Sequence, residues 1–213
     1  MPPRFFAAPP PFSPGSEPSG SGAPALDAAK AQLRLRARAT RLGLKGAVPD
    51  AATWAAALAP LDILLSARPC VLAVYHPVGA ELDPGPLAAR LGLEGAVVAL
   101  PVVVARNAPL IFRLQTDAEP VPDALGIMAP PPEAPEVRPD VVIVPLLAFD
   151  PTGARLGQGG GYYDRTLAQL RAQGAVLAVG LAYAGQAVAH IPVDGFDQRL
   201  DGVLTETAYL DFS

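Results

Sequence analysis

Residue types that often build active sites are scarce in this 213-residue sequence. It contains one cysteine, Cys70, and two histidines, His76 and His190. A single cysteine excludes an internal disulfide, and any zinc site would have at most one thiolate ligand. His190 belongs to no recognisable motif, and His76 precedes a proline in an expected loop. We therefore find no Ser-His-Asp or Cys-His constellation that would supply a protein nucleophile.

Long apolar runs are also missing from the sequence. The longest, residues 96–105, is too short to cross a lipid bilayer. Residues 1–24 are rich in proline, serine and glycine, and prolines stand where a signal peptide needs its apolar region. Such a segment buries too little surface to offset its ordering entropy. We therefore expect a disordered extension over residues 1–24, one domain over residues 25–213, no membrane segment and a cytoplasmic location.

Charged residues make up only 17% of the chain, and its net charge of −4 argues against a protein that binds nucleic acid over its whole surface. Residues 30–45 nevertheless contain six of the sixteen Lys and Arg residues and no acid. The apolar spacing of residues 26–44 predicts a helix. Its basic stripe consists of Lys30, Arg34, Arg38 and Arg41. The stripe is either a solvated face or, because like charges repel at this spacing, a surface for an anionic partner.

Expected strands alternate with expected helices in the remaining sequence. Apolar runs predict strands at residues 71–75, 97–104, 110–114, 141–149 and 175–182. Helical spacing predicts helices at residues 50–65, 84–91 and 165–173. The first of these helices places Trp54 and Leu58 on one apolar face and is broken or kinked at Pro60. This alternation indicates an α/β fold with three α/β/α layers, in which helices cover both faces of a mostly parallel sheet.

The expected strand at residues 141–149 leads into a glycine-rich loop and then a helix. The loop can reach positive φ and approach a phosphate closely at Gly157, Gly159, Gly160 and Gly161. A strand, loop and helix in this order aim backbone N–H groups at an anion, and Arg155 adds a planar donor fork. The spacing matches neither a dinucleotide fingerprint nor a Walker loop. The loop is therefore either a tight turn or an anion-binding loop.

Carboxylates follow several expected elements. Glu81 comes after the strand at residues 71–75, at the sheet edge where open α/β sheets bind ligands, although it could instead cap the next helix. Asp164 stands at the start of a helix, where a metal could bind. Further acids cluster near the end of the chain, as loop caps or as ligands: Asp194, Asp197 and Asp201.

Taken together, these segments resemble the 5-formyltetrahydrofolate cyclo-ligase (5,10-methenyltetrahydrofolate synthetase) family over residues 26–206. The most specific match is residues 144–165, which include Arg155-Leu-Gly-Gln-Gly-Gly-Gly-Tyr-Tyr-Asp164. Supporting matches are Lys30-Ala-Gln-Leu-Arg34, Tyr75-His-Pro with Glu81, and Asp197 with Asp201-Gly-Val-Leu-Thr-Glu206. The resemblance implies a CoA transferase-like three-layer fold. It also implies ATP- and Mg²⁺-dependent conversion of 5-formyltetrahydrofolate to 5,10-methenyltetrahydrofolate, with release of ADP and phosphate.

The same resemblance implies roles for individual residues. The implied catalytic residues are Lys30, Arg155 and Tyr163. The implied ATP-binding residues are Lys30, Arg34, Arg155, Leu156, Gly157, Gln158, Gly159, Gly160, Gly161, Tyr162 and Tyr163. Folate would contact Glu81, Tyr75 and Tyr162, and Mg²⁺ would bind Asp164 and Asp197. The implied partner is 5-formyltetrahydrofolate, with or without a polyglutamate tail, bound by a monomer that uses neither nucleic acid nor membrane.

One position departs from the family pattern, and two other functions stay open. Ala129 stands where family members often have a Glu before the proline, so the folate pocket can differ there. A sugar-phosphate isomerase or CoA transferase on a similar sheet would need a carboxylate base or nucleophile, for which Glu81 is the candidate. A non-catalytic regulator that binds nucleotide or folate is the second alternative. ATP-dependent turnover would separate the cyclo-ligase from both.

Overall fold

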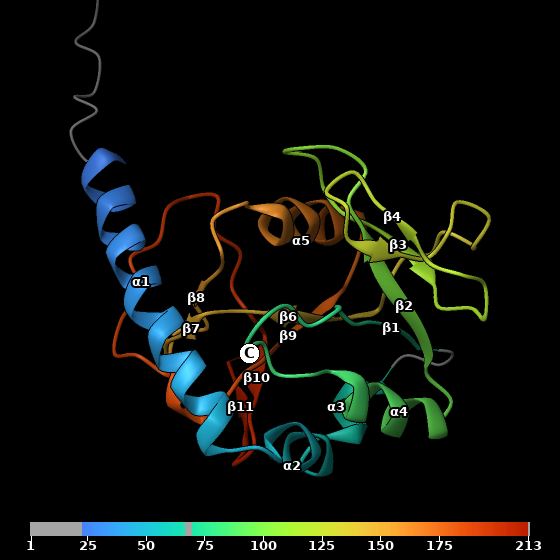
Figure 1. Cartoon of the computed structure of the whole chain (residues 1–213), viewed down its shortest axis with the longest axis horizontal. Helices are drawn as coiled ribbons and strands as arrows, with labels where there is room; N and C mark the ends of the chain where they lie inside the picture. Colours follow the sequence, from blue (N-terminus) through green and yellow to red (C-terminus); the bar gives the residue numbers. More distant parts are fainter. Residues whose placement is uncertain (1–22, 67–69, 213) are drawn as a thin grey trace, which may run out of the picture.

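A seven-stranded sheet lies at the centre of the residues that the computed structural model describes, 23–66 and 70–212 (Figure 1). Its strand order is β11-β10-β9-β6-β1-β2-β3. The strands are β1 (Val71–Ala73), β2 (Val97–Val102), β3 (Ile111–Leu114), β6 (Val141–Pro145), β9 (Leu177–Leu181), β10 (Gly202–Leu204) and β11 (Tyr209–Asp211). Strands β10 to β2 run parallel, and only the edge strands β11 and β3 are antiparallel. The predicted mostly parallel sheet is confirmed.

Helices cover both faces of this sheet (Figure 1). The helices are α1 (Ala23–Ala47), α2 (Ala51–Ala57), α3 (Leu61–Leu64), α4 (Gly85–Leu93) and α5 (Tyr162–Gln173). Helix α5 lies on one face and α2 to α4 lie on the other, while α1 runs along one side of the sheet. The three-layer arrangement is therefore confirmed. The extension predicted over residues 1–24 lies outside the described residues, except that α1 already begins at Ala23.

Strand β6 explains why the sequence shows a continuous apolar run instead of an alternating one. Val142 and Val144 pack with Leu167 of α5, whereas Ile143 belongs to the core on the opposite face. A strand of a parallel sheet that is buried on both faces needs apolar side chains at every position. On the opposite face, Leu87 of α4 completes the core with the helices α2 and α3.

Two predicted elements differ from the structure. The predicted helix at residues 50–65 is broken before Pro60 into α2 and α3, as expected, but its predicted apolar face is buried only toward its end, where Leu65 is 6% exposed. Trp54 and Leu58 are 50% and 45% exposed, and the small side chains of Ala51 and Ala55 are buried instead. Small residues allow close helix packing, and α2 packs against α4 through this face.

The predicted strand at residues 141–149 is divided in the structure. Strand β6 ends at Pro145, and β7 (Ala148–Phe149) instead forms an antiparallel pair with β8 (Arg155–Leu156). The carbonyl oxygens of Leu146 and Leu147 accept hydrogen bonds from the Gln186 side chain, at 2.9 and 3.0 Å. A side-chain amide thus takes the place of a strand partner, which the apolar pattern could not indicate.

A small hairpin of β4 (Val121–Pro122) and β5 (Met128–Ala129) lies beside the sheet. Ala129, the position that departs from the family pattern, is 1% exposed within this hairpin. A short 3-10 helix, η1 (Ala184–Gln186), follows β9. Among the described helices, none combines the length and the apolar character needed to cross a membrane.

Candidate functional site

A cavity of about 790 Å³ opens at the carboxyl ends of the parallel strands. From β1 the chain continues outward to β2, whereas from β6 it continues in the opposite direction to β9 and β10. The point where the strand order reverses therefore lies between β1 and β6, and such a point is where open α/β sheets bind ligands. Tyr75 and His76 after β1, and Leu146 after β6, line the cavity. The topology thus creates the cavity.

Every residue predicted for the site lies in the wall of this one cavity. These residues are Lys30, Arg34, Tyr75, Glu81, Arg155, Leu156, Gly157, Gln158, Gly159, Gly160, Gly161, Tyr162, Tyr163, Asp164 and Asp197. They come from α1, the segment after β1, β8, the glycine loop, the first turn of α5 and the loop before β10. Segments more than 160 residues apart in the sequence therefore meet here.

The glycine loop connects β8 to α5, and positive φ is needed at only two of its glycines. Gly159 has φ 104° and Gly161, at the start of α5, has φ 65°. The expectation of positive φ at Gly157 and Gly160 is wrong. Gly160 is required for a different reason, because a Cβ there would lie 2.9 Å from the Tyr162 ring. The loop brings the N-terminus of α5 to the cavity, where its N–H groups favour an anion.

Two residues of the basic stripe, Arg34 and the exposed Arg38, contact this loop. Arg34 Nε donates a hydrogen bond to the Gly157 carbonyl at 3.0 Å. Arg38 donates through Nε and Nη2 to the Gln158 side-chain oxygen, at 3.1 and 3.0 Å. The partners of these two arginines are thus backbone and amide oxygens of the loop. Helix α1 and the loop form one wall of the cavity.

Lys30 lies at the end of this wall and binds two carboxylates. Its Nζ atom is 2.8 Å from Asp194 Oδ2 and 2.5 Å from Asp197 Oδ2. Burial lowers the pKa of Lys30, but the two hydrogen bonds outweigh burial, and the pKa lies above its ordinary value. The hydrogen bond from Lys30 likewise lowers the pKa of Asp194. Both groups are therefore charged, and the lysine compensates the acids within the site.

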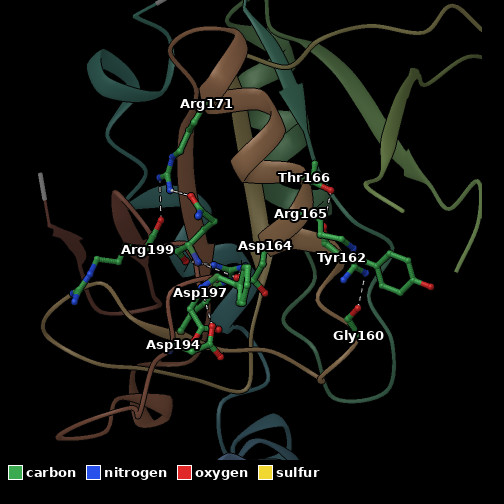
Figure 2. Close-up of polar contacts among 12 residues, drawn as sticks. Gly160, Tyr162, Asp164, Arg165, Thr166, Arg171, Asp194, Asp197 and Arg199 are labelled. Carbon is green, nitrogen blue, oxygen red and sulfur yellow. Dashed lines mark hydrogen bonds and ion pairs between the residues drawn. The ribbon is translucent and has the colours of Figure 1, made fainter. Parts of the chain in front are cut away.

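A second ion pair lies at the first turn of α5. Arg155 Nη2 donates to Asp164 Oδ1 at 2.8 Å, and the same oxygen accepts the Gln198 N–H at 3.0 Å. Arg155 also donates through Nη1 to the Gln198 carbonyl oxygen. Burial lowers the pKa of Arg155, and the nearby Asp164 opposes this shift. Figure 2 shows Asp164 at the helix start, with Asp197 and Asp194 close to it.

The two predicted magnesium ligands each retain one carboxylate oxygen. Asp164 uses Oδ1 in the bonds above, and Asp197 uses Oδ2 for Lys30 and for the Asp194 N–H. Asp164 Oδ2 and Asp197 Oδ1 take part in none of these bonds. In the described part of the chain, no group of three or more His, Cys, Asp or Glu side chains could hold a metal. The donor set therefore fits Mg²⁺ bound by one or two carboxylates with substrate phosphates and water, and does not fit an all-protein metal cage.

Glu81 lies at the other end of the cavity. Its Oε2 atom accepts the Val78 N–H at 3.0 Å, and its Oε1 atom is 3.4 Å from Arg41 Nη1. Glu81 does not cap α4, because Asp83 Oδ1 accepts the Gly85 N–H at the start of that helix. Glu81 therefore forms part of the cavity wall.

Tyrosines surround this carboxylate. The Tyr75 hydroxyl donates to the Leu82 carbonyl at 2.5 Å. Burial, and then the charge of Glu81, raise the pKa values of both Tyr75 and Tyr163. In contrast, the Arg165 guanidinium lies over the Tyr162 ring, with its Cζ atom 5.2 Å from the ring centroid. Arg165 also donates a hydrogen bond to the Gly160 carbonyl (Figure 2). Adjacent tyrosines thus serve different ends of the cavity, Tyr163 near Glu81 and Tyr162 near the glycine loop.

Sequence reasoning missed part of the wall. An apolar part of the cavity wall is formed by Val103, Leu110, Leu125 and Ile127. Apolar residues in loops carry no local signal that they face a ligand. The sequence shows Asp194 only as one of several clustered acids, although its carboxylate pairs with Lys30. Arg41 was recognised only as part of the basic stripe.

The fold and the lining of the cavity define the class of the protein. The chain is a three-layer α/β protein whose cavity is lined by cations and a glycine loop suited to phosphates, by one nearly buried carboxylate and by apolar side chains. Residues 28–206 match the 5-formyltetrahydrofolate cyclo-ligase family. The chain belongs to this family and is an enzyme of the ligase class.

Individual relatives agree with this assignment. The chain is 30% identical to the 5-formyltetrahydrofolate cyclo-ligase of Haemophilus influenzae over 179 residues, 81% of this chain and 95% of the relative. It is 38% identical to the Escherichia coli K12 enzyme of the same name over 140 residues, 63% and 76% of the two chains. The NMR structure of Aquifex aeolicus 5,10-methenyltetrahydrofolate synthetase superposes with a TM-score of 0.67 at 28% identity, covering 86% of this chain and 92% of that one.

Proposed function

We propose that this chain converts 5-formyltetrahydrofolate to 5,10-methenyltetrahydrofolate and couples the reaction to hydrolysis of ATP to ADP and phosphate. The observation that carries the proposal is the single cavity with two chemically different ends. Lys30, Arg34 and the glycine loop lie at one end, Glu81 lies beside Arg41 three turns further along α1, and apolar side chains complete the wall. One cavity can therefore hold a nucleotide and a reduced folate side by side. Membership of the cyclo-ligase family supports the same reaction.

The reaction divides into two steps. The formyl oxygen attacks the γ-phosphorus of ATP, so that an O–P bond forms, the bond to ADP breaks, and the formyl carbon becomes an N5-iminium phosphate. N10 then attacks this carbon and loses its proton, the C–O bond breaks, and phosphate leaves with the bonding electrons. Neither step needs a protein nucleophile. Phosphoryl transfer of this kind needs alignment of the reactants and compensation of phosphate charge.

The residues of the cationic end supply this compensation. Lys30 and Arg34 project from successive turns of α1, Lys30 toward the loop before β10 and Arg34 toward the glycine loop, and Arg155 lies beside the first turn of α5. We assign the ATP phosphates to these cations and to the N–H groups of the loop and of α5. Lys30 also pairs with Asp194 and Asp197, so phosphate binding would exchange some carboxylate contacts for phosphate contacts.

We assign Mg²⁺ to Asp164 and Asp197, through the oxygens that are not used in the ion pairs. Bound there, the ion would compensate charge on the ATP phosphates. Arg155 and Lys30 fix the orientation of these two carboxylates through their other oxygens. At the opposite end, Glu81 would accept hydrogen bonds from the pterin, and the apolar wall would exclude water from the folate.

A turnover assay tests the proposal directly. Purified protein is mixed with 5-formyltetrahydrofolate, and the near-ultraviolet absorbance of the methenyl product is followed with and without Mg-ATP. We expect product only when both Mg²⁺ and ATP are present. A flat trace from folded protein that binds ATP would overturn the proposed reaction and favour a binding protein. A monomer, acceptance of polyglutamate tails and a cytoplasmic location remain further proposals.

A further inference from the structure

Arg41 is a buried cation that the proposed reaction does not use. It lies on α1, three turns after Lys30, and its side chain is 7% exposed. Its Nη1 atom donates to the Leu146 carbonyl at 3.1 Å and lies 3.4 Å from Glu81 Oε1. Arg41 itself is not part of the cavity wall, whereas Leu146 and Glu81 both are. The hydrogen bonds of Arg41 therefore connect it to the cavity through those two residues.

The carbonyl that Arg41 binds is itself held in place. The Gln186 side chain donates to the Leu146 oxygen at 2.9 Å, and its own oxygen accepts the Tyr183 N–H at 2.9 Å. The Arg41 guanidinium thus joins α1 to the end of β6 and to the segment after β1. Gln186 of η1 binds the same carbonyl at the end of β6. Arg41 Nε is buried and has no hydrogen-bond partner in the described part of the structure. The position of the guanidinium is therefore set by Leu146 and Glu81.

We infer that Arg41 is the positioning residue for folate: it holds the Glu81 carboxylate in the orientation that binds the pterin. This inference rests on the proposed function. The Glu81 side chain is only 9% exposed, and a carboxylate so nearly buried is costly unless a cation or hydrogen bonds compensate it. The Val78 N–H satisfies one oxygen, and Arg41 fixes the other. Both oxygens keep lone-pair capacity for donors on the ligand.

This role also links the two ends of the cavity. Lys30 and Arg34 lie at the cationic end of α1, and Arg41 lies at the folate end of the same helix. Helix α1 therefore sets the distance between the two proposed subsites. A change at Arg41 acts on folate binding alone, since the contacts of Lys30 and Arg34 do not involve Arg41.

The test compares steady-state kinetics of Arg41→Met, Arg41→Lys, Glu81→Gln and the double variant Arg41→Met with Glu81→Gln. Arg36→Met is the matched control, because Arg36 is exposed on the same helix. We expect Arg41→Met and Glu81→Gln each to raise the KM for 5-formyltetrahydrofolate about tenfold, the usual effect of losing a hydrogen bond to a charged group. The KM for ATP should stay unchanged. Arg41→Lys should recover part of the loss, because lysine keeps the charge but lacks the planar fork.

The double variant distinguishes positioning from a general structural effect. If Arg41 acts through Glu81, the double variant has the same folate KM as Glu81→Gln alone. The inference would be overturned if the folate KM of the double variant rose by the product of the two single increases. Equal increases in the KM for ATP and for folate would also overturn it. A normal folate KM in Arg41→Met beside a raised one in Glu81→Gln would also overturn it while leaving the proposed function intact. A normal folate KM in Glu81→Gln would instead contradict the folate assignment itself. Should Arg41→Met fail to fold, Arg41→Lys supplies the same comparison.

Discussion

Lys30 shows how one residue can compensate charge within the protein and also serve a substrate. Its ammonium group contacts Asp194 and Asp197, and the same group lines the end of the cavity that we assign to ATP phosphates. A lysine on a flexible stem can exchange oxygen partners without moving the helix that carries it. We propose that the two aspartates hold the Lys30 ammonium group at this position before the ATP phosphates bind.

Replacing Lys30 by Met should therefore lower kcat/KM by about 10² to 10³-fold, the usual loss when one preorganised donor to a developing charge is removed. The measurement is the absorbance assay with saturating folate and varied ATP. Arg36→Met, on the exposed face of α1, should retain normal turnover. A near-normal rate in Lys30→Met would remove Lys30 from the nucleotide site.

Asp194 gives a pH dependence whose sign follows from its pKa. The hydrogen bond from Lys30 lowers the pKa of this carboxyl in the folded chain. A lowered folded-state pKa means that the stabilisation is complete above the ordinary Asp value of about 4 and is lost as the pH falls through the folded-state pKa. Asp194→Asn should thus reduce the urea midpoint near pH 7, and the difference from the parent should disappear once the pH is below the folded-state pKa of Asp194. An equal loss of stability at both pH values would contradict this linkage.

At the scale of elements, the glycine loop shows what local sequence can and cannot indicate. The strand, the loop and the helix start were predictable because apolar runs, glycines and helix spacing act over a few residues. Which glycines need positive φ was not predictable, since it depends on the loop's path past α1. The pairing of Arg41 with Glu81 was hidden for the same kind of reason, because only the strand order brings α1 across the end of β1 and β6.

Two alanine variants of the glycine loop test which of its glycines needs a positive φ. Gly161→Ala should lower the free energy of unfolding by about 1 to 2 kcal/mol, because an L-residue at φ 65° is strained. Its Cβ would also lie 2.7 Å from Arg165 Nη1 and displace that side chain from the Gly160 carbonyl. Gly157→Ala should be nearly neutral for stability, since φ is not positive there and no atom lies within 4 Å of the added Cβ. Equal urea midpoints for the two variants would contradict this account.

At the scale of the whole molecule, the cavity lies at a strand-order reversal that could be foreseen only in part. Alternating strands and helices predicted the sheet, and the segment after the strand at residues 71–75 was correctly placed at its ligand-binding edge. The order of the strands, and with it the neighbouring ends of β1 and β6, depends on long-range packing that a single sequence does not display. The apolar wall around Leu110 follows from that packing.

The two proposed subsites should stabilise the folded chain separately. Each ligand at about one hundred times its Kd should add about 2.7 kcal/mol of stability, which thermal denaturation reports as a higher midpoint. Lys30→Met should lose the shift caused by Mg-ATP and keep the shift caused by folate. Glu81→Gln should show the opposite pattern. Loss of both shifts in either variant would mean that the ends of the cavity are not independent sites.

Helix α1 precedes most of its partners at the site by more than a hundred residues in the sequence. Lys30 pairs with residues 164 and 167 positions further along the chain, and Arg34 with one 123 positions away. Contacts so distant in sequence form late, because the intervening chain must first be ordered. Arg41 and Arg34 find their partners earlier in synthesis, whereas Lys30 lacks both of its carboxylate partners until the loop before β10 leaves the ribosome.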